Sequence, residues 1–217
     1  MTIFIGDIRL LPSDSKPTGI FKSKLQMPAW LGCDGIAGDA QADRRVHGGP
    51  EKAVHQYPAA HYPRLAEVFP EAGSLLVPGS IGENLSMPGW DETNVCIGDT
   101  FRLGDAVIQI SQPRTPCWKI DSRYGVEGMA RFIEAEGLTG WYFRVIEAGI
   151  VGPGSEFSLI ERLSAEATVS GLLALWRKQR PAPEELECFA ETPALSPNWV
   201  NKLRDRGRQL RQRSPQQ

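Results

Sequence analysis

The sequence predicts a mainly β fold, a closed or nearly closed barrel with peripheral helices, followed by a small all-α domain of three helices. Residues 1–163 are rich in glycine and proline and contain many short β-like segments separated by turn residues, which is typical of a barrel. After Leu163 the sequence changes to apolar residues at helical spacing, divided by prolines. We therefore expect one domain over residues 1–163 and a second over residues 164–217.

The predicted strands are short apolar or β-branched segments bounded by glycine, aspartate or proline. Two of them, residues 95–97 and 100–103, flank Gly98-Asp99, and we expect them to pair as a hairpin. The full set is residues 3–10, 19–25, 95–97, 100–103, 106–111, 142–150 and 156–161.

Two helices are expected within the barrel. Residues 58–69 form the first, which either starts at Pro63 or is kinked there, because proline lacks the N–H that a helix interior uses. Residues 126–136 form the second, with Gly137 placed to cap its C-terminus.

Three helices are expected after the barrel. Ser164 is the expected N-cap of the first, whose apolar residues begin at Val169. Residues 184–191 form the second, between prolines. Ser196 and Pro197 match the N-cap and first position of the third.

The composition is ordinary for a globular protein, with 41% hydrophobic and 23% charged residues and a formal net charge of −2. Such a balance excludes a polycation that binds nucleic acid through its overall charge. No secretory leader is visible, and no apolar run reaches the roughly 18 residues of a membrane span. We expect a cytoplasmic protein that does not associate with membranes.

Four cysteines occur without any CxxC pair, so the sequence predicts neither a zinc ribbon nor an iron–sulfur cluster. Disulfides are not expected in a reducing compartment. Cys96 and Cys188 are expected in the core, whereas Cys33 lies in a loop and either role stays open for it. Any cysteine chemistry therefore depends on a single thiol.

Cys117 is the best candidate for that thiol. It lies in the segment Gln112-Pro113-Arg114-Thr115-Pro116-Cys117-Trp118-Lys119, where two prolines stiffen the loop. Arg114 and Lys119 place positive charge on both sides, which favours the thiolate that ligates metals.

The segment from Arg45 to Pro58 is a second candidate. Backbone N–H groups at Gly48-Gly49 suit an anion such as phosphate, and Lys52 and Arg45 add charge. A polar turn explains the same residues, and on composition alone it is favoured.

A third candidate is Glu83-Asn84, a polar pair between apolar residues. It either presents a carboxylate and an amide to a pocket or forms a tight turn stabilised by Asn84, and taken alone the turn is favoured.

The C-terminal segment is basic, with six cations against Asp205. A solvated face or a docking surface explains it better than nucleic-acid binding, because the rest of the chain carries excess acid. The cations are Lys202, Arg204, Arg206, Arg208, Arg211 and Arg213.

Taken together, the three segments resemble those of MOSC-domain proteins of the YiiM type, in order and in spacing. The resemblance covers nearly the whole chain, because these proteins also end in three helices. It implies a β-barrel that binds molybdenum cofactor (Mo-molybdopterin). It also implies reduction of N-hydroxylated compounds (hydroxylaminopurine-like bases, hydroxylamines and amidoximes) to amines, with the oxygen leaving as water.

The resemblance assigns Cys117 as the molybdenum ligand and catalytic residue. A soft thiolate suits this metal, and one cysteine suffices because the pterin supplies further sulfur ligands. The expected cofactor-binding residues are His47, Gly48, Gly49, Lys52, His55, Tyr57, Glu83, Asn84, Gln112 and Arg114.

The chain lacks a Gly-x-Gly-x-x-Gly motif and a set of cluster-binding cysteines, so electrons are expected from a separate reductase, a flavoprotein. The basic C-terminal helix is one possible docking face for it. A non-catalytic carrier of the cofactor or of sulfur would use the same Cys117 and is the alternative. Both a monomer and a homodimer are compatible with the sequence.

Overall fold

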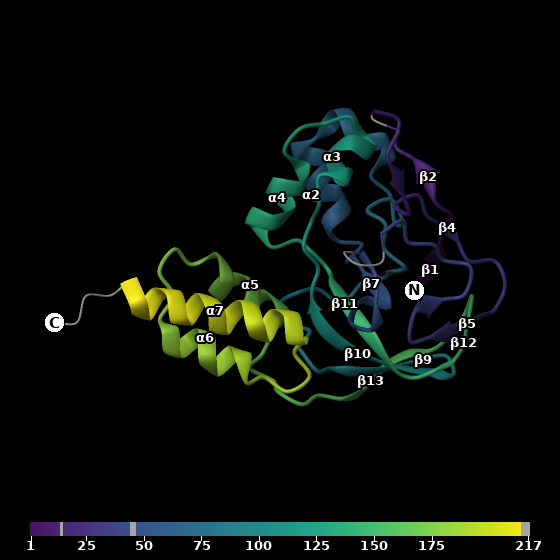
Figure 1. Cartoon of the computed structure of the whole chain (residues 1–217). Coiled ribbons are helices and arrows are strands. Elements are labelled where there is room, and N and C mark those ends of the chain that lie inside the picture. The colour runs from purple at the N-terminus through teal and green to yellow at the C-terminus, as the bar shows by residue number, and fades with distance from the viewer. Residues whose placement is uncertain (14, 44–46, 214–217) are drawn as a thin grey trace.

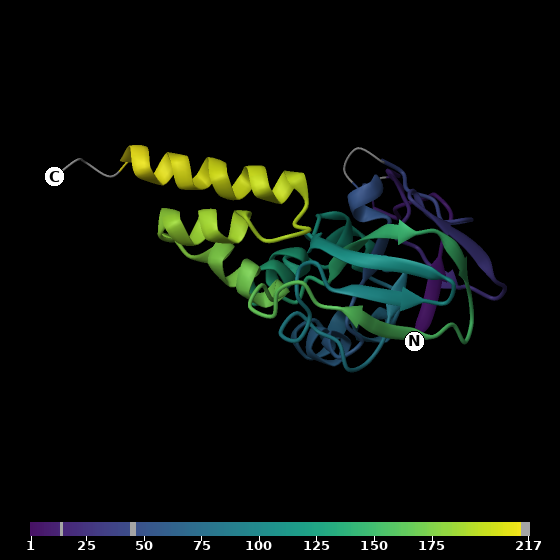
Figure 2. The ribbon, with the colours of Figure 1, turned by 90° about the horizontal axis from the view of Figure 1, so that it is seen from below.

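A curled sheet forms the centre of the fold in the computed structural model, which describes residues 1–13, 15–43 and 47–213 (Figures 1 and 2). Within these residues the sheet has eight strands in the order β13-β9-β10-β11-β7-β8-β1-β4 and curls into a half-barrel. Neighbouring strands are antiparallel, except for the parallel pair β7 and β8. The strands are β1 (Thr2–Ile5), β4 (Ser23–Lys24), β7 (Val54–Gln56), β8 (Leu85–Ser86), β9 (Thr100–Leu103), β10 (Ala106–Pro113), β11 (Trp141–Glu147) and β13 (Phe157–Glu161).

Two smaller sheets flank the large one. One has the order β12-β5-β6, and the other pairs β2 with β3. Their strands are β2 (Arg9–Leu10), β3 (Pro17–Thr18), β5 (Ala29–Gly32), β6 (Gly35–Ile36) and β12 (Gly149–Val151). The predicted strands 3–10 and 142–150 are thus each divided between two sheets.

The predicted hairpin across Gly98 is wrong. Strand β9 pairs with β10 and β13, whereas Cys96 makes only an isolated bridge to Thr168. The Asp99 carboxylate accepts the Cys96 N–H at 2.9 Å, so that donor is taken by a side chain and is lost to a strand ladder.

Short helices pack at one end of the sheet (Figure 1). Helix α2 (His61–Val68) begins two residues before Pro63. It therefore neither starts at the proline nor needs a kink, because the first turn of a helix has no partner for its N–H groups. Helix α4 (Met129–Glu136) ends at Gly137 with φ 74°, as predicted. The sequence analysis did not anticipate α3 (Lys119–Tyr124), nor the 3₁₀ helices η1 (Pro50–Lys52) and η2 (Pro70–Leu75).

Three helices follow the sheet, so the prediction of a mainly β fold with C-terminal helices is confirmed (Figure 1). They are α5 (Val169–Arg177), α6 (Pro183–Ala190) and α7 (Pro197–Arg213). Ser196 caps α7 as predicted, since its hydroxyl accepts the Trp199 N–H at 3.4 Å. The N-cap of α5 is Thr168, which accepts the Gly171 N–H at 3.0 Å, and the prediction of Ser164 is wrong.

The helices and the sheet share one apolar core. Phe101, Phe143 and Trp141 of the sheet belong to the same buried cluster as Leu172 of α5 and Leu203 of α7. Such continuity fixes the position of the helices relative to the sheet. The boundary between residues 163 and 164 remains a prediction from the sequence.

Only one of the two cysteines expected in the core is buried there. Cys96 is fully buried, whereas Cys188 is exposed. Leu186 and Ala190, four residues apart on α6, face the core, so Cys188 between them points away from it. None of the helices in the described residues combines the length and the apolar character needed to cross a membrane.

The cap of α5 gives a test of the fold. Replacing Thr168 with alanine removes the acceptor for the Gly171 N–H, and we expect the free energy of unfolding to fall by about 1 kcal/mol in urea titrations. Ser164→Ala is the matched control and should change stability little. Equal losses in the two variants would contradict the assignment.

Candidate functional site

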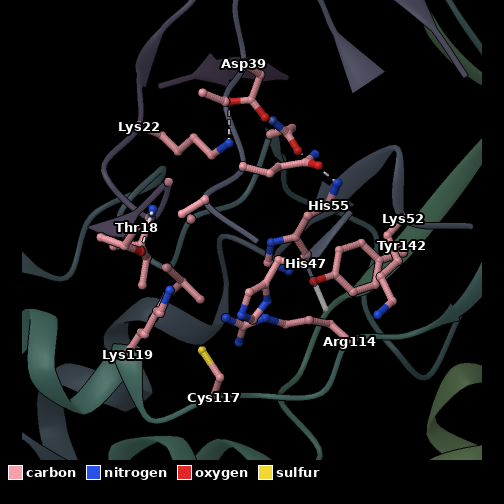
Figure 3. A pocket seen from close by; sticks show the side chains of 18 residues that line it. Thr18, Lys22, Asp39, His47, Lys52, His55, Arg114, Cys117, Lys119 and Tyr142 are labelled. Atoms are coloured by element: carbon pink, nitrogen blue, oxygen red, sulfur yellow. Dashed lines mark hydrogen bonds and ion pairs between the residues drawn. The ribbon is translucent and has the colours of Figure 1, made fainter. Parts of the chain in front are cut away.

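Two pockets that share part of their lining adjoin at Cys117 (Figure 3 shows the first). The barrel-side pocket, with a volume of about 80 Å³, lies among Thr18, Lys22, Asp39, His55, Asn84, Arg114 and Lys119. The helix-side pocket, with a volume of about 340 Å³, lies among Gln112, Thr115, Pro116, Asn198 and Lys202. Four residues line both pockets: His47, Lys52, Cys117 and Tyr142.

Cys117 is positioned by the end of a strand and the start of a helix. Strand β10 ends at Pro113, and the Arg114 N–H then donates to the Gly140 carbonyl at 3.0 Å. The Cys117 carbonyl accepts the Ile120 N–H at 3.0 Å as α3 begins. The partly buried thiol therefore projects from a loop fixed at both ends into the barrel-side pocket (Figure 3).

Arg114 brings a buried positive charge to this pocket. Its side chain lies beside His47 and points toward the space above Cys117 (Figure 3). The residue is only 6% exposed, and its Nη1 has no hydrogen-bond partner among the described residues. Burying a guanidinium N–H without a hydrogen bond costs free energy. This atom therefore indicates a ligand that is anionic or offers a hydrogen-bond acceptor.

Burial and nearby cations keep the two pocket histidines neutral. Burial lowers the pKa of His55 well below its ordinary value, and Arg114 acts in the same direction. Burial also lowers the pKa of His47, with smaller effects from Lys119, Arg114 and Lys52. The His55 Nε2 is buried without a hydrogen-bond partner among the described residues. It is thus a second polar atom that a ligand would satisfy.

An ion pair closes the far end of the barrel-side pocket. Lys22 pairs with Asp39, whose carboxylate also accepts the Asn84 side-chain amide and the Gly6 N–H, both at 2.9 Å. The Asn84 Oδ1 accepts the His55 N–H at 3.1 Å. Asn84 therefore lines the pocket and also fixes the backbone of His55 relative to the ion pair.

Cations outnumber acids around Cys117. Lys119 reaches across the rim and donates to the Pro17 carbonyl at 2.9 Å. Lys52 lies 6.0 Å from the centre of the Tyr142 ring. Among the described residues that line either pocket, Asp39 is the single carboxylate, and Lys22 already neutralises it. The net potential therefore favours an anionic ligand.

Four residues expected from the sequence lie outside both linings. Glu83 is buried and accepts the Gly79 and Ile81 N–H groups at 2.6 and 3.1 Å, so it stabilises its own turn. Tyr57 is also buried, and its hydroxyl has no partner among the described residues. Gly48 and Gly49 precede η1, with φ 93° at Gly49. Arg45 lies outside the described residues.

Several residues of the barrel-side pocket were not expected from the sequence, and Tyr142, Lys22 and Asp39 are the aromatic and charged ones among them. Burial raises the pKa of Tyr142, and its ring centre lies 5.2 Å from that of His55. A tyrosine in a predicted strand and an isolated lysine carry no local pattern that marks a site. Only the pairing of β11 with β7 places Tyr142 beside His55.

The described residues hold no group of three or more histidine, cysteine, aspartate or glutamate side chains that could bind a metal ion. A metal bound to the Cys117 thiol would therefore need further ligands from a cofactor or from solvent.

The neutral state of His55 predicts a pH dependence of stability. Because its pKa is lowered in the folded protein, the unfolded chain binds the proton more readily, so stability falls as the pH drops through about 6.5. We expect wild type to lose about 1 kcal/mol more than His55→Gln between pH 7.0 and 5.5 in urea titrations. Identical losses in both proteins would show that His55 is protonated equally in the folded and unfolded states.

Comparisons with known proteins agree with this architecture. A family model of the MOSC domain matches residues 43–158, more than half of the chain. Protein YiiM of Escherichia coli is 35% identical over 94% of this chain and 90% of its own length. Uncharacterized protein YflK of Bacillus subtilis is 43% identical over 92% of this chain and 90% of its own length.

Two further proteins add to the comparison. A protein of Gibberella moniliformis named Reductase is 38% identical over 67% of this chain, although the match spans only 26% of that protein. The crystal structure of YiiM from Geobacillus stearothermophilus has a TM-score of 0.79 at 28% identity, over 94% of this chain and 96% of that one. With the family model and YiiM relatives along nearly its whole length, the chain belongs to the MOSC-domain family.

Proposed function

We propose that this protein reduces N-hydroxylated compounds to amines with molybdenum cofactor bound in the barrel-side pocket. The observation that carries the proposal is the Cys117 thiol, which projects from a fixed loop into a cavity lined by cations and unsatisfied polar atoms. Membership of the MOSC-domain family and a relative named Reductase fit a function associated with this cofactor and an oxidoreductase-like role.

The donors present fit a pterin dithiolene cofactor with a phosphate group. The thiol is a soft ligand of the kind that molybdenum accepts alongside dithiolene sulfur. Arg114 Nη1 and His55 Nε2 are buried polar atoms without partners among the described residues, and a polar heterocycle or a phosphate would satisfy them. The surplus of cations matches the negative charge of the phosphate.

Each residue has a distinct part in this proposal. When bound, the cofactor supplies the two-electron chemistry that cleaves the N–O bond. Cys117 would bind the metal, and Arg114, with Lys119 and Lys52, would bind the anionic groups of the cofactor. His47 lines both pockets, and its lowered pKa keeps a neutral ring nitrogen available to accept or return a proton. Loss of oxygen as water consumes two protons, so a titratable group beside Cys117 is needed.

The electrons are proposed to come from a separate reductase, a flavoprotein. The basic helix α7 has fewer arginines available to dock this reductase than the sequence indicates. Arg206 binds the carbonyls of Trp176 and Lys178, and Arg211 pairs with Glu184 and Glu187. These two cations therefore hold the helices together.

Replacing Cys117 with alanine tests the proposal. Protein produced in cells that make the cofactor should contain molybdenum, and it should reduce benzamidoxime to benzamidine with a chemical electron donor. Cys117→Ala should lose at least 100-fold in rate, because the single protein ligand of the metal is gone. Cys33→Ala, in an exposed loop, is the matched control and should keep both metal and activity.

Two results would contradict the proposal. Turnover unchanged in Cys117→Ala would remove the thiol from the mechanism. Wild type that holds molybdenum in equal amount yet reduces no hydroxylamine, amidoxime or hydroxylaminopurine would instead indicate a carrier of the cofactor.

A further inference from the structure

The helix-side pocket extends from Cys117 to the beginning of α7. Gln112, Asn198 and Lys202 line it, and none of them lines the barrel-side pocket. Cys117, His47, Lys52 and Tyr142 form the shared wall. The Cys117 thiol borders both pockets. A substrate in the helix-side pocket would therefore lie next to a group bound at Cys117 in the barrel-side pocket. The volume of the helix-side pocket, about 340 Å³, lies at the lower end of the range of small-molecule sites.

The helix that carries Lys202 is fixed to the strand that carries Gln112. The Ser196 N–H, at the start of α7, donates to the carbonyl of Ser111 at 2.9 Å. Ser111 directly precedes Gln112 in β10. Trp199 is buried in the shared core, and the Lys202 ammonium lies 5.2 Å from its ring centre. A backbone hydrogen bond and a shared apolar core therefore hold the two walls of the helix-side pocket together.

The charge of this pocket is entirely positive among the described residues that line it. Lys52 approaches from η1 and Lys202 from α7, with His47 between the two pockets. Burial lowers the pKa of Lys52, and the nearby charge of Lys202 lowers it further. Two ammonium groups close enough to affect each other favour an anion between them.

Gln112 supplies a second kind of contact. The residue is only 3% exposed, and its Oε1 has no hydrogen-bond partner among the described residues. A buried carboxamide oxygen in this state requires a donor, such as the N–H or O–H of a ligand. The pocket thus presents an acceptor at Gln112 and a pair of cations at Lys52 and Lys202.

We propose that the helix-side pocket selects N-hydroxylated substrates that carry a carboxylate or a phosphate, with Lys52 and Lys202 binding the anion and Gln112 accepting a hydrogen bond from the substrate N–H or O–H. This inference rests on the proposed function, because it assigns the substrate class of that site. It gives α7 a direct role in recognition: the C-terminal helices complete the substrate pocket.

Binding to cofactor-free protein is the first test. We expect 4-carboxybenzamidoxime to bind at least tenfold more tightly than benzamidoxime in calorimetric titrations at low salt. Lys202→Met should remove most of that preference, and added salt should weaken it. Lys178→Met, which removes an exposed lysine between α5 and α6, is the matched control and should keep the preference. Equal affinity of wild type for the two amidoximes would exclude the carboxylate as the recognised anion, and together with no preference for the nucleoside monophosphate it would overturn the inference.

Turnover by the molybdenum-loaded enzyme is the second test. The ratio of kcat/KM for the carboxylated over the neutral amidoxime should fall about tenfold in Lys202→Met and stay unchanged in Lys178→Met. A ratio unaffected by Lys202→Met would contradict the inference while leaving the proposed reductase intact. Failure of loaded wild type to reduce either compound would contradict the proposed function, and the binding titrations would still decide the inference.

The two sources of the anion are separated by a phosphate series. Hydroxylaminopurine, its nucleoside and its nucleoside monophosphate are compared with the amidoximes in the same titrations. Tighter binding confined to the monophosphate identifies a nucleotide substrate, and tighter binding confined to the carboxylate identifies an organic acid. A preference for neither anionic compound overturns the inference.

Discussion

The close approach of the backbone at Gly140 fixes the geometry on which the site depends. With φ at 68°, a Cβ on this residue would lie 2.2 Å from the Gln56 carbonyl oxygen, so no side chain fits. The Gly140 carbonyl accepts the Arg114 N–H, and its own N–H donates to Glu92 at 2.6 Å. The strand that carries His55, the loop that carries Cys117 and the buried carboxylate of Glu92 thus meet at one residue.

Glu92 extends this constraint to the helices. Its second carboxylate oxygen lies 2.8 Å from His61 Nε2 in α2, and its backbone carbonyl accepts the Ser170 N–H of α5 at 2.7 Å. Removing one partner from such a buried network leaves the others without hydrogen bonds, which lowers the free energy of unfolding by several kcal/mol. The position of the C-terminal helices and the position of the Cys117 loop are therefore set by the same group of contacts.

The sequence was sufficient where local pattern decides structure. The cap at Gly137 and the start of α7 at Ser196 both follow from residues adjacent in the chain. Predictions from the sequence were wrong where a side chain takes a backbone N–H that a strand ladder would use, and where several residues suit the same capping position. Asp99 takes the N–H of Cys96, and Thr168 caps α5 although Ser164 is equally suited by type. Such choices depend on tertiary contacts that local propensity does not contain.

The candidate site shows the same division. Cys117 and Arg114 stand out in the sequence because they share one unusual loop, and the structure places both at the pocket. Tyr142 and Lys202 come from segments about 25 and 85 residues further along the chain, and only the fold brings them to the same space. Glu83 was a candidate from the sequence, but its carboxylate accepts backbone N–H groups of the turn in which it lies.

The distribution of charge separates the structural cations from those that serve a ligand. The chain carries a formal net charge of −2, yet the described linings of the two pockets hold lysines, Arg114 and one already neutralised carboxylate. Arg162, Arg206 and Arg211 bind acidic groups or carbonyls elsewhere in the fold. Gathering several like charges in a partly buried space costs free energy in the protein without ligand, because the cations repel one another and lose hydration. An anion bound between these cations would offset that cost, so the same electrostatic arrangement couples ligand binding to the stability of the fold.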